Sequence, residues 1–132
     1  MIRCFTAMVL VAVVATVAFS EGPVPDQAPS VRSDVLHADR EAGRAPVVID
    51  VRTVEEYATG HIPGAVNIPF DEVAKRIVDI DAPNGVILYC MVGPRARKGE
   101  SALLAAGYEK VFHLEGGLAA WQAAGLSVEV SP

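Results

Sequence analysis

The residue best suited to chemistry is Cys90, which stands directly after a short apolar run at residues 86–89. Arg95 follows five residues later, and Pro94 before it is suited to the first turn of a helix. Free N–H groups at a helix start favour a nearby anion. The spacing therefore predicts a loop that cradles the Cys90 sulfur as a thiolate or as a terminal persulfide anion. An inert buried thiol before an ordinary turn is the alternative.

Two further charged residues, Asp50 and Arg52, stand at the end of a second apolar run at residues 47–51. Ligands of open parallel sheets bind beyond the C-terminal ends of the strands. We therefore expect Asp50 and Arg52 to lie beside the loop that follows Cys90. They would hold its walls through hydrogen bonds or an ion pair, and direct contact with substrate is the alternative.

Short apolar runs alternate with helical patterns along the chain. This alternation predicts an α/β fold, in which helices cover both faces of a parallel sheet. The expected strands are 47–51, 65–68, 86–89 and 111–114; the expected helices are 54–59, 71–80, a segment from about 94 to 107, and 118–124, with a weaker helical pattern over 31–45.

The N-terminal segment has the pattern of an export signal. Arg3 precedes an apolar run over residues 5–19, and small residues stand at positions 18 and 20. We expect residues 1–20 to be a secretory signal peptide and the protein to be periplasmic or secreted, with an uncleaved anchor as the alternative. Residues 21–33 are expected to be a flexible, proline-rich leader, and residues 34–132 the folded domain.

Composition limits the classes of partner that the protein is expected to bind. The formal net charge is −5 at pH 7, and loss of Arg3 leaves ten basic and sixteen acidic residues. Because no basic patch or run is present, nucleic acid is not expected as a partner. Cys4 would leave with the signal, so Cys90 would be unpaired. There is no Cys-x-x-Cys, the histidines are scattered, and we expect neither a metal nor a cofactor. The expected state is a monomer.

Four segments carry a resemblance: DVRTVEEY at 50–57, GHIPGAVNIP at 60–69, YCMVGPR at 89–95, and 106–117 followed by Trp121. In order and spacing they resemble the signatures of the rhodanese family, and exported single-domain members of the phage-shock type look nearest. The resemblance implies a rhodanese-like three-layer α/β/α fold with a central parallel sheet of about five strands. It also implies a sulfurtransferase. Cys90 would take a sulfane sulfur from a donor such as thiosulfate and pass it from a persulfide to a thiophilic acceptor, such as cyanide or a small-molecule or protein thiol.

The family's active-site loop reads Cys-x-x-Gly-x-Arg. The resemblance therefore implies that substrate is bound by the loop together with Asp50 and Arg52; the loop residues are Met91, Val92, Gly93, Pro94, Arg95 and Ala96. Family members often have Ser or Thr at the position of Val92 and Ser or Ala at that of Ala96. Two potential hydroxyl donors are thus missing, and Met91 and Val92 make the loop mouth apolar. We expect weak thiosulfate turnover, or an acceptor with an apolar part.

Two other functions remain open. Cysteine phosphatases and arsenate reductases of related fold use Cys-x5-Arg, whose arginine position is Ala96 here. The longer loop of those enzymes holds a larger oxyanion, so the spacing disfavours this activity. A rhodanese fold used as a binding module is the non-enzymatic alternative, although such modules typically lose the cysteine.

Overall fold

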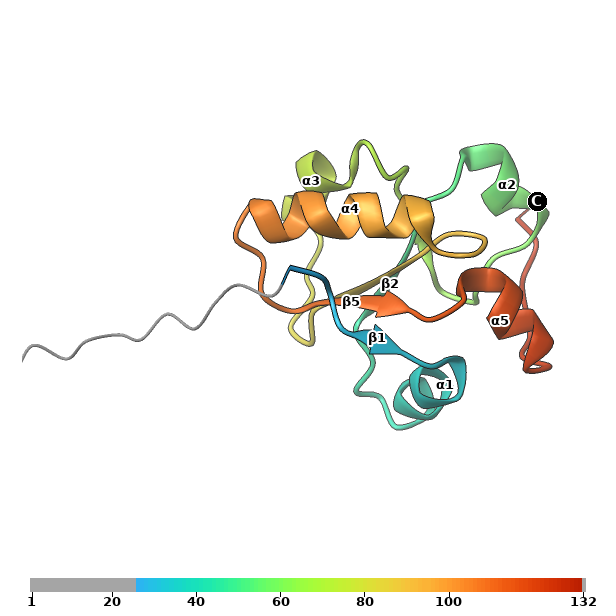
Figure 1. The fold of residues 1–132 in the computed structure, drawn as a ribbon. Helices are drawn as coiled ribbons and strands as arrows, with labels where there is room; N and C mark the ends of the chain where they lie inside the picture. The colour runs from blue at the N-terminus through green and yellow to red at the C-terminus, as the bar shows by residue number, and fades with distance from the viewer. Residues whose placement is uncertain (1–25, 132) are drawn as a thin grey trace, which may run out of the picture.

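The computed structural model describes residues 26–131, and it is built on five parallel strands (Figure 1). Their order across the sheet is β1-β5-β4-β2-β3, which places β4 at the centre. The strands are β1 (Ser30–Val31), β2 (Val47–Asp50), β3 (Val66–Asn67), β4 (Val86–Tyr89) and β5 (Val111–Leu114). Because the strands are parallel, β2 and β4 end at the same edge of the sheet.

Helices cover both faces of the sheet and form the outer layers (Figure 1). Successive side chains of a strand point to opposite faces, so Leu88 packs toward α3 and α4, while Ile87 packs toward α1 and α5. The three-layer α/β prediction is therefore confirmed. The helices are α1 (Ser33–Glu41), α2 (Val54–Thr59), α3 (Val73–Arg76) with a 3₁₀ turn at Ile77–Asp79, α4 (Pro94–Ala105) and α5 (Gly117–Ala123).

The N-terminal part of the described chain differs from the prediction. Residues up to 33 were expected to be a flexible leader, but β1 joins the sheet and α1 begins at Ser33. The physical reason is the edge of β5. The backbone N–H groups of His113 in β5 and of Glu115 directly after it donate to the carbonyls of Pro29 and Val31, both at 2.9 Å. Two residues of strand are too few to leave a periodic pattern in the sequence.

The predicted signal peptide and the helix predicted over 71–80 have different outcomes. The proposed signal peptide at residues 1–20 lies outside the described residues. Among the helices that the structure describes, none has the length and apolar character needed to cross a membrane. The helix expected over 71–80 is shorter and breaks into α3 and the 3₁₀ turn.

Candidate active site

The Cys90 loop begins where β4 ends, at the edge of the sheet that the sequence predicted. Cys90 itself is only 1% exposed, while the next two side chains, Met91 and Val92, lie at the surface. The chain then turns at Gly93 and enters α4 with Pro94 in its first turn. The loop therefore encloses the sulfur and presents an apolar mouth to solvent.

A backbone N–H group is directed at the sulfur. Gly93 N donates to Cys90 Sγ at 3.1 Å. Gly93 has φ +144°, a conformation that L side chains rarely adopt, so the turn that aims this N–H favours glycine. The N-terminal end of α4 lies next to it, where helix N–H groups lack carbonyl partners in a preceding turn. This end of the loop is suited to a sulfur anion.

The start of α5 holds the other side of the loop. Leu118 N donates to the Cys90 carbonyl at 2.9 Å, and Ala119 N donates to the Met91 carbonyl at 3.0 Å. Gly117 allows this approach, because a Cβ at that position would lie 2.5 Å from the Cys90 carbonyl oxygen. The loop is therefore fixed by two helices, α4 through its own chain and α5 through hydrogen bonds.

Arg95 has a partner that the sequence did not indicate. Its two terminal nitrogens bind the carboxylate of Glu56 on α2, at 2.6 Å and 3.0 Å. The hydrogen bonds from Arg95 lower the pKa of Glu56 to about 2, and the same contact raises the pKa of Arg95. Both side chains are about one-third exposed, so the pair lies at the surface of the site. An anionic substrate that uses Arg95 must share it with Glu56.

Asp50 and Arg52 form a buried ion pair, with side chains 0% and 2% exposed. Arg52 Nη2 donates to Asp50 Oδ2 and to the Gly60 carbonyl, both at 2.7 Å. Tyr89 on β4 donates to Asp50 Oδ2 at 2.6 Å and accepts from Ile62 N at 3.0 Å. Burial and the neighbouring Asp50 carboxylate raise the pKa of Tyr89. This network links the ends of β2 and β4 to the segment around residues 60–62.

The remaining predicted loop residues have distinct positions. Ala96 is fully buried and packs in the same apolar cluster as Cys90. Pro94 is exposed and has no N–H to donate. The position that a Cys-x5-Arg loop requires for arginine is therefore filled by a small core side chain.

A second polar pair lies against the loop and was missed in the sequence. His113 on β5 and Glu100 on α4 are buried, and His113 Nδ1 lies 2.6 Å from Glu100 Oε1. The spacing of 13 residues between a helix and a strand leaves no local sequence pattern. Within residues 26–131 there is no group of three or more metal-ligating side chains.

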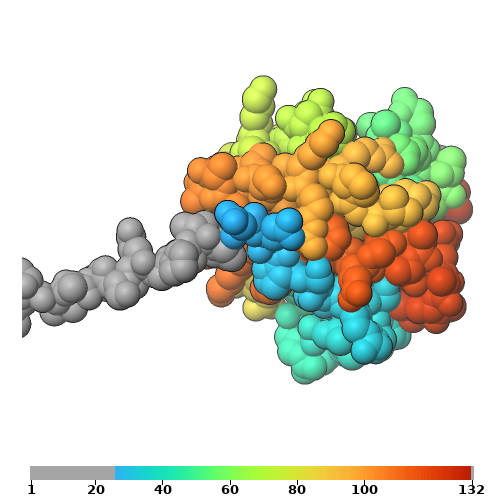
Figure 2. Space-filling model, in the orientation of Figure 1, coloured from blue at the N-terminus to red at the C-terminus, as the bar shows by residue number. Residues whose placement is uncertain are grey.

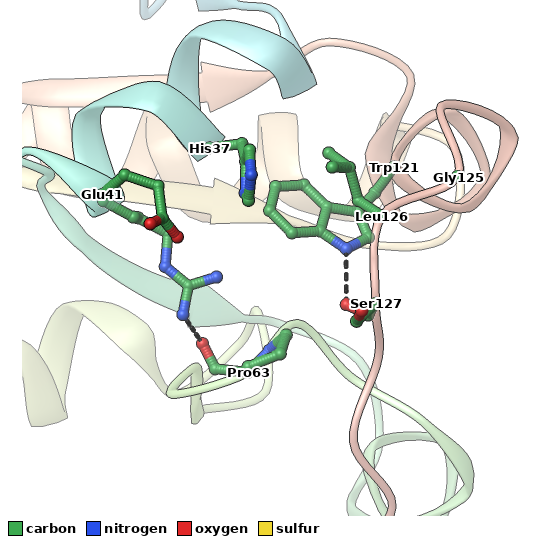
Figure 3. A pocket seen from close by; sticks show the side chains of 8 residues that line it. His37, Glu41, Pro63, Trp121, Gly125, Leu126 and Ser127 are labelled. Carbon is green, nitrogen blue, oxygen red and sulfur yellow. Dashed lines mark hydrogen bonds between the residues drawn. The ribbon is translucent and has the colours of Figure 1, made fainter.

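A separate cavity of about 490 Å³ lies between α1 and the end of α5 (Figure 3). The Arg40 guanidinium donates to the Pro63 carbonyl at its rim, and Trp121 Nε1 donates to the Ser127 carbonyl. No residue of the Cys90 loop lines this cavity. Its contacts join α1 to the segments around Pro63 and Ser127, and it is not part of the Cys90 site.

The model of the family described as "Rhodanese-like domain" matches residues 33–124 of the chain, including the whole Cys90 loop. The chain belongs to the rhodanese-like domain family. This rhodanese-like chain is 34% identical over 82 residues to a sulfurtransferase from Allochromatium vinosum, covering 62% of this chain and 77% of that protein. It is 34% identical over 88 residues to the thiosulfate sulfurtransferase GlpE from Pseudomonas fluorescens, covering 65% and 79%.

Another relative of the rhodanese-like chain has a different role. An HTH-type transcriptional regulator from Mycobacterium tuberculosis is 39% identical over 100 residues, covering 74% of this chain but 43% of that protein. Among solved structures, a thiosulfate sulfurtransferase from Pseudomonas aeruginosa superposes with a TM-score of 0.72 at 33% identity, covering 80% of this chain and 21% of that one. This chain therefore spans less than half of each of these two proteins.

Proposed function

We propose that the chain is a sulfurtransferase in which Cys90 carries the transferred sulfur. The observation that carries the proposal is the Gly93 N–H directed at Cys90 Sγ from a loop at the C-terminal end of β4. A backbone donor 3.1 Å from the sulfur stabilises a thiolate, and equally the terminal anion of a persulfide. The named sulfurtransferases among its relatives support the same activity.

The proposed chemistry has two displacements. The Cys90 thiolate attacks the outer sulfur of a donor such as thiosulfate, a new S–S bond forms, and sulfite leaves with the electron pair of the broken S–S bond. A thiophilic acceptor, cyanide or a small-molecule or protein thiolate, then attacks the terminal sulfur of the persulfide. The Cys90 thiolate leaves and is ready for another cycle. No cofactor is needed, because the sulfur atom itself is the carried group.

The surroundings of Cys90 favour particular substrates. Glu56 occupies Arg95 and offsets its charge, which weakens the site for a doubly charged donor such as thiosulfate. Met91 and Val92 at the mouth favour an acceptor or donor with an apolar part. We therefore expect turnover with thiosulfate to be slow compared with turnover of an apolar persulfide donor.

We further propose that the protein is an exported single-domain rhodanese of the phage-shock type. It would act as a monomer in the periplasm or outside the cell. The basic, apolar and small-residue sections of residues 1–20 support this. Expression in a bacterium with a periplasm, followed by fractionation and N-terminal sequencing, tests it. A periplasmic chain beginning at Glu21 is expected, and a cytoplasmic chain that keeps residue 1 would refute export.

The function is tested by intact mass. The chain is incubated with thiosulfate, its mass is recorded, and cyanide is then added while thiocyanate is assayed. Gain of one sulfur, lost on cyanide and absent in Cys90→Ser, is the expected result. A free and accessible thiol that gains no sulfur from thiosulfate or from a polysulfide would refute sulfur transfer. It would favour a non-catalytic binding module in which Cys90 does not react.

A further inference from the structure

Glu100 and His113 form a buried acid–base pair that the proposed sulfur chemistry does not use. Glu100 projects from α4, which follows the Cys90 loop, and His113 projects from β5, the neighbour of β4 in the sheet. Both side chains are buried, and a carboxylate in such a place is stable only when it is paired. Its contact of 2.6 Å with His113 Nδ1 is in the short range of charge-assisted hydrogen bonds.

The pair directs the far edge of the imidazole ring toward the Cys90 loop. Glu100 contacts Nδ1, so Nε2, the other ring nitrogen, remains available to face the loop. A Cβ placed on Gly93 would lie 3.7 Å from His113 Nε2 and 3.8 Å from Cε1. Gly93 is the residue whose N–H reaches Cys90 Sγ. The ring therefore backs the part of the loop that contacts the sulfur.

A third residue connects the pair to the N-terminal segment. Arg97 Nη1 lies 3.3 Å from Glu100 Oε2 and donates to the Ala28 carbonyl at 2.7 Å. Arg97 Nη2 donates to Ser30 Oγ at 3.0 Å. Figure 2 shows the blue N-terminal segment of the described chain lying against the orange α4. Arg97 and the imidazole of His113 therefore share one buried carboxylate.

Other charged or titratable groups around the pair are otherwise engaged or exposed. Arg95 binds Glu56, Lys98 lies over the ring of Phe70, Tyr89 binds Asp50, and Lys75 and Arg76 of α3 are exposed. The elements β1 and β5 add no further charged side chain to the pair. Glu100, Arg97 and His113 are thus the charged or titratable groups of the buried pair itself, and Arg95 adds a further positive charge that acts on Cys90.

We infer that His113 is a positioning residue for sulfur transfer, held by Glu100 behind Gly93 so that its protonated ring stabilises the anionic Cys90 sulfur. The inference rests on the proposed function, in which Cys90 reacts as an anion. Two cationic groups against one carboxylate leave an excess positive charge when the ring is protonated, and that charge favours the thiolate or the persulfide anion. When the ring loses its proton, the stabilisation is lost. A regulator of reactivity is thereby placed inside the fold, without contact with substrate.

The experiment measures the pH dependence of Cys90 alkylation by iodoacetamide in the full chain, in a Cys4→Ser background that leaves one thiol. His113→Asn is the main variant, because the Asn amide can still donate to Glu100 as Nδ1 does, while Nε2 and the charge are lost. The pH midpoint of alkylation is expected to rise by about 0.5 to 1 unit. Below the midpoint this equals roughly three- to tenfold slower alkylation at a given pH.

His37→Asn is the matched control, since His37 is exposed on α1 and lines the separate cavity. Its midpoint is expected to equal that of the parent. His113→Gln provides a second variant if His113→Asn does not fold, as judged by circular dichroism. A folded His113 variant whose midpoint equals that of the parent would overturn the inference and leave the pair a purely structural contact.

Sulfur loading separates this inference from the proposed function. The parent chain is incubated with thiosulfate or a polysulfide over the same pH range, and the gain of one sulfur is followed by mass. A parent that gains no sulfur refutes the proposed function, whereas alkylation still tests His113 because it needs no sulfur donor. A parent that loads sulfur while the His113 variant loads with an unchanged pH profile refutes the inference alone.

Discussion

At the scale of single residues, the hydrogen bond to the Cys90 sulfur comes from a backbone N–H group and not from a side-chain hydroxyl. The position before Gly93 is Val92, which has no hydroxyl, and the position after Arg95 is Ala96, which is buried in the core. The remaining cation, Arg95, is bound by Glu56. Within the loop itself, the donors directed at a sulfur anion are therefore the Gly93 N–H and the start of α4. This arrangement makes two single-residue changes informative.

Replacing Val92 by Ser is expected to speed thiosulfate turnover. Val92 is 62% exposed at the loop mouth, so a hydroxyl there costs little in stability and adds a donor for the persulfide or the thiosulfate oxygens. One added hydrogen bond of about 1 kcal/mol corresponds to a roughly fivefold faster reaction. Steady-state thiocyanate formation measures it. Val78→Ser, at a similarly exposed position outside the loop, is the control, and equal rates for both variants would contradict the argument.

Replacing Glu56 by Gln is expected to make stability less dependent on pH. The pKa of Glu56 is lowered to about 2 by the hydrogen bonds from Arg95, below its ordinary value of 4.5. A carboxylate with a lowered pKa stabilises the fold above its ordinary pKa, and that contribution is lost as the pH falls from about 4.5 to 2. The wild type should therefore be more stable than Glu56→Gln at pH 7, with the difference shrinking below pH 4.5.

Urea unfolding at pH 7, 4 and 3 measures this effect for Glu56→Gln and for Glu55→Gln. Glu55 is the exposed neighbour on α2 and makes no hydrogen bond with another side chain of the described residues. Its variant should differ little from the wild type at any of these pH values. A constant difference between wild type and Glu56→Gln over the whole range would show that the Arg95 contact does not depend on the charge of Glu56.

At the scale of elements, the sequence predicts the strands and helices that have a local apolar pattern. It does not predict contacts between residues that are far apart in the chain. The buried runs at 47–51, 86–89 and 111–114 predicted β2, β4 and β5 because each is continuously apolar. The Cys90 loop was predicted from the strand end and Pro94. β1 was missed because two residues carry no periodicity. The contacts Glu56–Arg95 and Glu100–His113 join residues 39 and 13 positions apart, and no local pattern marks them.

Replacing Gly117 by Ala is expected to disturb the contact between α5 and the Cys90 loop. A Cβ there would lie 2.5 Å from the Cys90 carbonyl oxygen and 2.7 Å from the Met91 carbonyl oxygen. The loop would have to move, which should slow sulfur loading at least tenfold and cost about 2–4 kcal/mol of unfolding free energy. Sulfur loading by mass and urea unfolding measure the two effects.

Gly125→Ala is the matched control for this change. Gly125 has φ +75°, close to the +59° of Gly117, but a Cβ at Gly125 would meet no atom within 4 Å. It should show only the backbone cost of about 1 kcal/mol and keep normal loading. If both variants lose the same stability and the same loading, the close approach of α5 to the loop does not matter for the site.

At the scale of the whole molecule, the N-terminal segment at residues 26–31 packs against the rest of the fold and is expected to stabilise it. It covers the edge of β5 and reaches α4 through Arg97, which also contacts Glu100. Ala28 is buried at the same place. If the chain is cut before Glu21 on export, the released form keeps all of these contacts. A form that lacks β1 loses them together.

A chain that begins at Arg32 is therefore expected to be less stable than one that begins at Glu21. It lacks the carbonyls of Pro29 and Val31 that accept from His113 and Glu115, the Ala28 carbonyl and Ser30 hydroxyl that bind Arg97, and the buried side chain of Ala28. Loss of three or four hydrogen bonds at about 1 kcal/mol each predicts a cost of roughly 3 kcal/mol. The uncovered edge of β5 should also promote association. Urea unfolding and size-exclusion chromatography measure these effects, and a chain that begins at Asp26 serves as control because it keeps all of these contacts. Equal stability of all three forms would show that β1 is dispensable. Residues 21–33 would then contribute as little to stability as the flexible leader that the sequence predicted.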